Sequence, residues 1–246
     1  MTLYDLSGKS ALVTGGARRI GRAIALAFAR CGADVAITYR SSKTEADQTA
    51  EAIAALGVRS AAIDCDVRSE AAVRAAVRAA AGQFGKLDLL VNNAAIFVSS
   101  PLDQITVDEW NAVFETNTRG PFLFGREALP YLRASRGRIV NLGSLGGLHA
   151  WPDHAHYCSS KAALHMLTQT MARAFAPEVS VNCVAPGSID ADGNDTSDRA
   201  VRFAEKTPMK RNGAVEDIAD AVLFFAAGPS FVTGQILAVD GGLGLI

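Results

Sequence analysis

The sequence has few of the features that mark extracellular, membrane or nucleic-acid-binding proteins. Its four cysteines are far apart and form no C-x-x-C pair, so neither a zinc site nor a disulfide framework is indicated. The formal net charge is −1 over 246 residues, which provides no basic surface for nucleic acid or an anionic membrane. No apolar run reaches about 18 residues, and the first ten residues contain no apolar signal region. We therefore expect a soluble, cytoplasmic protein that binds neither nucleic acid nor membranes.

The chain also lacks a linker, a low-complexity stretch and an internal repeat. Hydrophobic residues make up 49% of it and charged residues 20%, which is ordinary for a globular core. Short apolar runs alternate with helical patterns, and this rhythm predicts a parallel sheet with helices on both faces in one domain, 1–246. The runs predicted as strands are 10–14, 34–39, 60–66, 87–94, 138–144, 179–187 and 231–242.

The first strand is followed by a glycine-bearing loop, GGARRIG, and then by a helical pattern. In such a loop, backbone N–H groups and a helix N-terminus can approach a pyrophosphate closely. Near the other end of the chain, the polar segment 188–212 follows the strand 179–187. A segment of that length beyond a strand's carboxyl end is predicted to form a lid over the site.

Two side chains in the predicted helix 155–176 are candidates for acid–base chemistry. Tyr157 and Lys161 are four residues apart and so share one helix face. A free tyrosine has a pKa of about 10, and we expect the neighbouring ammonium to lower it. Tyr157 could then protonate a carbonyl oxygen, to which Ser144, at the end of strand 138–144, could also hydrogen-bond. The alternative is a chance Y-x-x-x-K pattern.

A long helix is predicted over 107–135, with a disturbance near its middle. Pro121 has no N–H, so it cannot donate the helical hydrogen bond to the carbonyl of Asn117. Gly120 loosens the same turn. We expect the free carbonyl of Asn117 to bind water, although a kink without function would give the same pattern.

Taken together and in order, these motifs resemble the short-chain dehydrogenases/reductases, over nearly the whole chain. The motifs are TGGARRIG (14–21), Asp66-Val67, NNAA (92–95), Asn117, Ser144, Tyr157-x-x-x-Lys161, Pro186-Gly187 and the closing VDGG. The resemblance implies a single-domain Rossmann fold, a doubly wound sheet of seven parallel strands with helices on both faces. It also implies an NAD(P)-dependent enzyme that forms a homotetramer, with Asn117, Ser144, Tyr157 and Lys161 as catalytic residues.

The family likewise implies where the dinucleotide lies. Gly15 and Gly21 should border the pyrophosphate, and Lys161 should hold the nicotinamide ribose. The full set of expected cofactor-binding residues is Gly15, Arg18, Arg19, Ile20, Gly21, Arg40, Ser41, Asp66, Val67, Asn93, Ala94, Tyr157, Lys161, Pro186, Gly187 and Ile189.

The end of the second strand favours NADP(H). An NAD enzyme usually has an acidic residue there to hold the ribose diol, whereas this chain has Arg40 followed by Ser41. An arginine can bind a 2′-phosphate through charge-assisted hydrogen bonds, and Arg18 could supply a second charge. The alternative is that Arg40 is only a solvated strand-end residue.

The substrate class stays open because of one departure from the family. The middle glycine of the loop is Arg19 here, an exchange also found in pteridine reductases. Arg19 favours a pterin or an anionic substrate, whereas Ser144 suits a simple ketone or aldehyde. A 3-oxoacyl-carrier-protein reductase and a non-catalytic dinucleotide-binding sensor are further alternatives.

The histidines near Tyr157 do not form a zinc pattern, so no metal is expected. His154 and His156 instead precede Tyr157 closely enough to contribute to a substrate pocket, together with Phe97 and Trp151.

Overall fold

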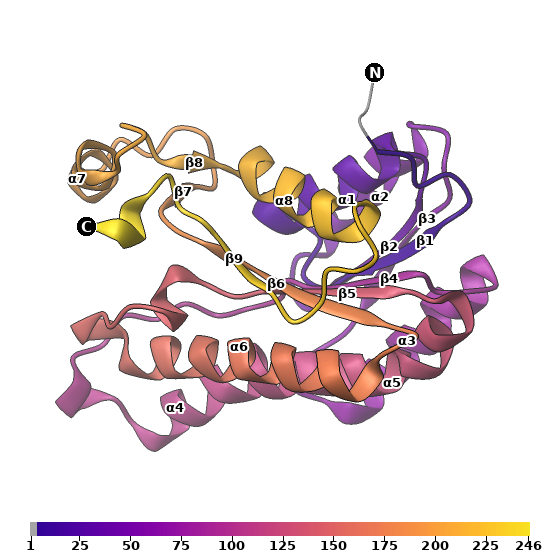
Figure 1. The fold of residues 1–246 in the computed structure, drawn as a ribbon, viewed down its shortest axis with the longest axis horizontal. Coiled ribbons are helices and arrows are strands. Elements are labelled where there is room, and N and C mark those ends of the chain that lie inside the picture. Colours follow the sequence, from indigo (N-terminus) through magenta and orange to yellow (C-terminus); the bar gives the residue numbers. More distant parts are fainter. Residues whose placement is uncertain (1–3) are drawn as a thin grey trace.

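The computed structural model describes residues 4–246 and contains a seven-stranded parallel sheet. The strand order is β3-β2-β1-β4-β5-β6-β9, so the direction of winding reverses between β1 and β4 (Figure 1). The strands are β1 (Ser10–Val13), β2 (Asp34–Tyr39), β3 (Ser60–Asp64), β4 (Leu89–Asn92), β5 (Arg138–Leu142), β6 (Ser180–Pro186) and β9 (Ile236–Val239). The predicted doubly wound, single-domain Rossmann fold is confirmed.

Helices cover both faces of this sheet, as Figure 1 shows. One face carries α1 (Arg19–Arg30), α2 (Lys43–Ala54) and α8 (Val215–Ala227). The other face carries α3 (Glu70–Phe84), α4 (Val107–Phe114), α5 (Gly120–Ser135) and α6 (Ala155–Phe175). Every residue of β1 and β4 is buried, because each side of those central strands packs against a helical layer. This explains their unbroken apolar runs.

The helix predicted over 107–135 is interrupted where the prediction placed the disturbance. A π-helical turn, Glu115–Arg119, separates α4 from α5, and the N–H of Gly120 donates to the carbonyl of Glu115. Pro121 then lies in the first turn of α5, where a missing N–H costs least. Turns of this kind occur often at functional sites.

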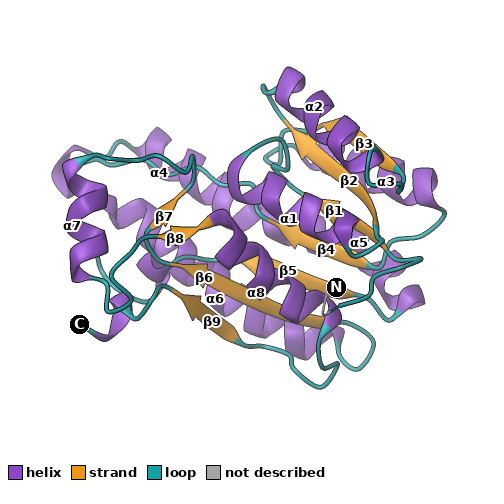
Figure 2. Cartoon of the chain, turned by 90° about the horizontal axis from the view of Figure 1, so that it is seen from above, coloured by secondary structure: helices purple, strands orange, loops and turns teal. Residues whose placement is uncertain are grey.

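A small two-stranded sheet that the sequence did not reveal joins the start of segment 188–212 to the residues that follow it. The two-residue strands β7 (Ile189–Asp190) and β8 (Gly213–Ala214) pair in parallel and bracket the helix α7 (Asp198–Lys206). Both ribbon views place α7 at the end of the molecule where the chain terminates (Figures 1 and 2). The N–H of Met209 donates to the carbonyl of Gly241 at 3.1 Å and so joins the segment 188–212 to the C-terminal segment of the chain.

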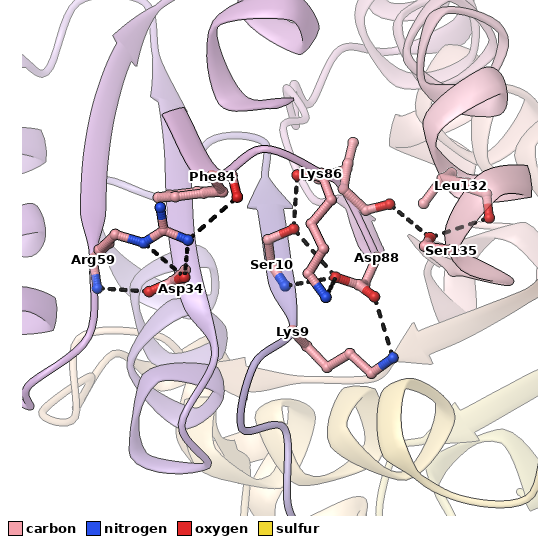
Figure 3. Close-up of polar contacts among 10 residues, drawn as sticks. Lys9, Ser10, Asp34, Arg59, Phe84, Lys86, Asp88, Leu132 and Ser135 are labelled. Atoms are coloured by element: carbon pink, nitrogen blue, oxygen red, sulfur yellow. Dashed lines mark hydrogen bonds and ion pairs between the residues drawn. The ribbon is translucent and has the colours of Figure 1, made fainter. Parts of the chain in front are cut away.

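A buried carboxylate fastens the amino ends of β1 and β4, opposite the edge that carries the motifs (Figure 3). Asp88 accepts from the N–H of Ser10 at 2.9 Å and lies 3.2 and 3.0 Å from the ammonium groups of Lys9 and Lys86. Burial by itself would raise the pKa of Asp88, but these donors outweigh it and hold the pKa below its usual value. The carboxylate therefore stabilises the sheet.

Within residues 4–246, no helix combines the length and the apolar character needed to cross a membrane.

Candidate active site

A cleft of about 650 Å³ runs across the carboxyl ends of the strands. All of the predicted cofactor-binding residues line it, as do Ser144, Tyr157 and Lys161, whereas Asn117 lies behind the wall. Because the sheet changes its winding direction between β1 and β4, the loops that follow these two strands separate and leave a crevice there. The tertiary fold thus brings together residues that the sequence separates by up to about 170 positions.

The glycine loop folds tightly at the start of the cleft. Gly15 has a φ of +63°, and a Cβ on Gly21 would collide with the carbonyl oxygen of Gly15. Both positions therefore need glycine. Arg19, at the position of the missing glycine, also has a left-handed φ, +52°. Arg19 thus adopts a left-handed conformation that glycine would adopt more readily.

The guanidinium of Arg19 lies at the cleft and pairs with a residue of segment 188–212. It donates to both carboxylate oxygens of Asp192, at 3.1 and 2.9 Å. Both side chains are more than half exposed, so the pair is screened by solvent. Asp192 is a partner of Arg19 that sequence reasoning missed.

Thr14 organises the crevice between β1 and β4, and it was not among the predicted site residues. Its hydroxyl accepts from the N–H groups of Asn93 at 2.9 Å and Ala94 at 3.0 Å. The Asn93 amide returns hydrogen bonds to the carbonyls of Thr14 and Gly15, at 2.8 and 3.0 Å. The signal that could have revealed Thr14 is a hydroxyl residue placed directly between a buried strand and a glycine loop.

At the far end of the cleft, Arg40 follows β2 and is exposed to solvent. Its guanidinium makes no hydrogen bond or ion pair with another residue between 4 and 246, and the same is true of the guanidinium of Arg18. Arg68 lowers the pKa of Asp66 through hydrogen bonds, and the charge of Arg40 adds to this effect. Two guanidinium groups are thus presented to the cleft beside β2 and the glycine loop.

Tyr157 and Lys161 lie on one face of α6, as predicted, with the ammonium 5.8 Å from the centre of the phenol ring. Lys161 is only 3% exposed, donates to the carbonyl of Leu142 at 2.7 Å, and has its pKa lowered by burial to about 8. Burial also raises the pKa of Tyr157, and the Ser144 hydroxyl opposes that shift. The expectation of a lowered Tyr157 pKa is therefore wrong for this structure, because desolvation dominates the overall shift.

The loop that carries Ser144 rests on His165, a residue whose role the sequence did not suggest. The ring is 6% exposed, and its Nε2 accepts weakly from the N–H of Ser144 at 3.4 Å. A Cβ on Gly143 or Gly147 would collide with this ring, so the two glycines let the loop pack directly on it. Burial, followed by the charge of Lys161, lowers the pKa of His165 to about 4. The ring is consequently neutral at physiological pH.

Asn117 connects the π-helical turn to the helix that carries Tyr157. Its amide exchanges hydrogen bonds with the backbone of Ile96, at 2.9 and 3.0 Å, and donates to the hydroxyl of Ser160 at 3.1 Å. That hydroxyl in turn donates to the carbonyl of Tyr157 at 2.7 Å. The Asn117 side chain, which is 1% exposed, thus positions the first turn of α6. Water binding by its carbonyl stays a prediction.

Aromatic rings surround Tyr157. Phe97 meets it edge to face at 4.7 Å between centroids, and Trp151 stacks at 6.4 Å. Phe97 and Trp151 line the cleft, as predicted. His154 stacks on Phe97 from outside the lining, and the prediction for His156 is wrong because that ring is fully buried in the first turn of α6.

A parallel sheet with a glycine loop at its switch point and a cleft across its carboxyl edge defines a dinucleotide-binding Rossmann fold. Comparison with known proteins narrows this class. The family model described as enoyl-(acyl carrier protein) reductase matches residues 15–244. The 3-oxoacyl-acyl-carrier-protein reductase FabG of Staphylococcus epidermidis is 40% identical over 96% of this chain and 98% of its own.

Two further relatives differ in what they are named for. The 3beta-hydroxysteroid dehydrogenase 1 of Eggerthella lenta is 39% identical over 98% of this chain and 95% of its own. A short-chain dehydrogenase from Burkholderia cenocepacia, solved in complex with NADP, is 40% identical, with a TM-score of 0.92 over 97% of this chain and 98% of that one. This chain belongs to the short-chain dehydrogenase/reductase family of oxidoreductases.

Proposed function

We propose that this protein is an NADPH-dependent oxidoreductase that reduces a carbonyl (or C=N) group of a small molecule. The observation that carries the proposal is the placement of Ser144, Tyr157 and Lys161 in the wall of the cleft, with the Lys161 ammonium 5.8 Å from the centre of the phenol ring. The NADP complex of the Burkholderia cenocepacia relative supports the choice of cofactor, and the names of the two enzyme relatives are consistent with carbonyl–alcohol chemistry.

In this mechanism, NADPH supplies the hydride when it is bound. Tyr157 donates its proton to the substrate oxygen as negative charge develops there, and Ser144 stabilises the same oxygen. The raised pKa of Tyr157 keeps the phenol protonated before the reaction, so it can act as the acid. Lys161, whose buried charge lies beside the ring, stabilises the phenolate that remains. Asn117 holds the helix turn that presents Tyr157.

The preference for NADPH rests on the guanidinium groups of Arg40 and Arg18, with the hydroxyl of Ser41 beside them. A charge-assisted hydrogen bond to a 2′-phosphate is worth about 1.5–3 kcal/mol, which corresponds to roughly 10- to 100-fold in Kd. Arg40→Ala should therefore weaken the binding of NADPH by that factor and the binding of NADH by less than about threefold. Fluorescence titration of both cofactors measures this effect. Arg30→Ala, at the distant end of α1, is the matched control, and tighter binding of NADH by the wild type would contradict the assignment.

Turnover distinguishes an enzyme from a dinucleotide sensor. Tyr157→Phe should lower kcat by about 10²- to 10⁴-fold while NADPH still binds, since the variant lacks only the acid. NADPH oxidation should be followed across ketones, aldehydes, oxoacyl thioesters and dihydropterins. NADPH binding without turnover on any of them would instead support the sensor.

Among the alternatives, the 3-oxoacyl-carrier-protein reductase has specific support from the FabG relative, whereas the pteridine reductase is supported only by the presence of Arg19 at the cleft. Fast reduction of an oxoacyl thioester relative to its simple ester would favour the former. Selective reduction of dihydropterins would restore the latter.

We also propose that the chain assembles as a homotetramer and that segment 188–212 is the substrate lid. Several large apolar side chains are exposed on the α4–α5 face and at the C-terminus, including Trp110 (37%), Phe122 (41%) and Leu245 (88%). Burial between subunits would remove that surface from water. Light scattering that gives a monomer at micromolar concentration would contradict the assembly.

A further inference from the structure

Arg199 is a cation on the lid helix α7 that faces the cleft without a polar partner. Its Cζ lies 5.6 Å from the ring centroids of both Phe97 and Phe203, so the guanidinium is held between two aromatic rings. The guanidinium makes no hydrogen bond or ion pair with any residue in the described part of the chain, and Arg199 lines the cleft. The two rings restrict the side chain yet accept none of its N–H groups in the plane.

Two carboxylates of segment 188–212, those of Asp190 and Asp195, accept hydrogen bonds from backbone N–H groups. Asp195 accepts a hydrogen bond from the N–H of Ser197 at 2.9 Å, and this bond is the main cause of its lowered pKa. The charge of Arg199 contributes less to that shift. Asp190 accepts from the N–H groups of Gly193 at 2.8 Å and Asp195 at 3.2 Å. Neither carboxylate neutralises Arg199 in a direct pair, so its hydrogen-bonding capacity is left for a ligand.

The position of Arg199 separates it from the groups assigned to the cofactor. Arg18 and Arg40 lie beside the glycine loop and β2, whereas Arg199 rests on Phe97, the ring that contacts Tyr157 edge to face at 4.7 Å. The charge of Arg199 also contributes to the low pKa of His154, after burial, which places it on the same side as the aromatic wall. This cation therefore belongs to the substrate end of the cleft.

We propose that Arg199 is a specificity-determining residue that binds a carboxylate on the substrate, so that the preferred substrates are oxo acids with an apolar or aromatic body. A guanidinium matches a carboxylate with two parallel N–H bonds, and prior restriction between Phe97 and Phe203 reduces the entropy lost on binding. The rings of Phe97, Trp151 and Phe203 supply an apolar wall for the body of the substrate. The proposal rests on the proposed carbonyl reduction, which it narrows to a substrate class.

The test compares an acid with its neutral ester in the same assay. With NADPH saturating, kcat/KM is measured for 2-oxo-4-phenylbutanoate and for its ethyl ester, using the wild type, Arg199→Gln and Arg199→Lys. We expect the wild type to favour the acid by roughly 10- to 100-fold, the range of a charge-assisted hydrogen bond, and Arg199→Gln to lose that ratio. Arg199→Lys should keep part of it, because it retains the charge without the fork.

Arg202→Gln is the matched control, since Arg202 lies on the same helix, donates to the carbonyl of Asp198 at 3.2 Å and does not line the cleft. It should keep the wild-type ratio. The proposal would be overturned if the wild type preferred the ester, or if Arg199→Gln kept the preference for the acid. Either result would leave the proposed carbonyl reduction intact. Absence of turnover with either compound would count against the proposed function instead. In that case, quenching of tryptophan fluorescence by the acid in the NADP⁺ complex still tests Arg199, and equal binding to Arg199→Gln would overturn its role.

Discussion

Acidification should destabilise this protein through His165, the buried ring beneath the Ser144 loop. In an unfolded chain a histidine titrates near pH 6.5, whereas burial and Lys161 lower the pKa of His165 to about 4 in the folded protein. Between these two values, only the unfolded chain takes up the proton. The free energy of unfolding is therefore unaffected by this group above pH 6.5 and falls as the pH decreases toward 4. At about 1.4 kcal/mol per pH unit, the full effect is about 3 kcal/mol.

Urea unfolding at pH 7.0, 5.5 and 4.5 would measure this loss in the wild type and in His165→Gln. We expect the wild type to lose about 2–3 kcal/mol more than the variant over this range, because glutamine takes up no proton. The absolute stability of the variant is not the readout, so a packing defect does not obscure the result. His149→Gln is the control variant, since it makes the same substitution at an exposed histidine. Parallel loss of stability in the wild type and His165→Gln would refute the reasoning.

Three further outcomes follow from the other buried or strained groups. Lys161→Met should raise the free energy of unfolding at pH 7 by about 1–3 kcal/mol, because it removes a buried charge whose pKa is about 8, while NADPH-dependent turnover falls. A loss of stability would contradict this expectation. Asp88→Asn should lower the free energy of unfolding by about 1–3 kcal/mol at pH 7, measured by urea unfolding. The difference in this free energy between wild type and variant should shrink as the pH falls through the lowered pKa of Asp88. A difference that does not change with pH would rule out the charge of Asp88 as its cause. Arg19→Gly should change the free energy of unfolding by less than about 1 kcal/mol, because glycine adopts the left-handed φ without strain. This gain offsets the greater flexibility of glycine and the loss of the exposed ion pair with Asp192. A larger loss of stability would show that the ion pair contributes more than an exposed pair should.

Much of the fold could be predicted because its signals are local. The strands β1 and β4 are buried on both sides and therefore read as continuous apolar runs. The disturbance between α4 and α5 follows from the missing N–H of Pro121. The short strands β7 and β8 could not be found in this way, because two-residue strands carry no periodicity.

The sequence by itself determined which chemical groups are present and how those near each other in the chain are spaced: the glycine loop, the pair of Tyr157 and Lys161 on one helix face, and Arg40 at a strand end. These follow from backbone geometry, which repeats every few residues. Only the tertiary structure decided their surroundings. The direction of the Tyr157 pKa shift, and the position of Arg199 between Phe97 and Phe203, depend on segments that meet only after folding. Desolvation and charge act through space, so no spacing along the chain could have supplied them.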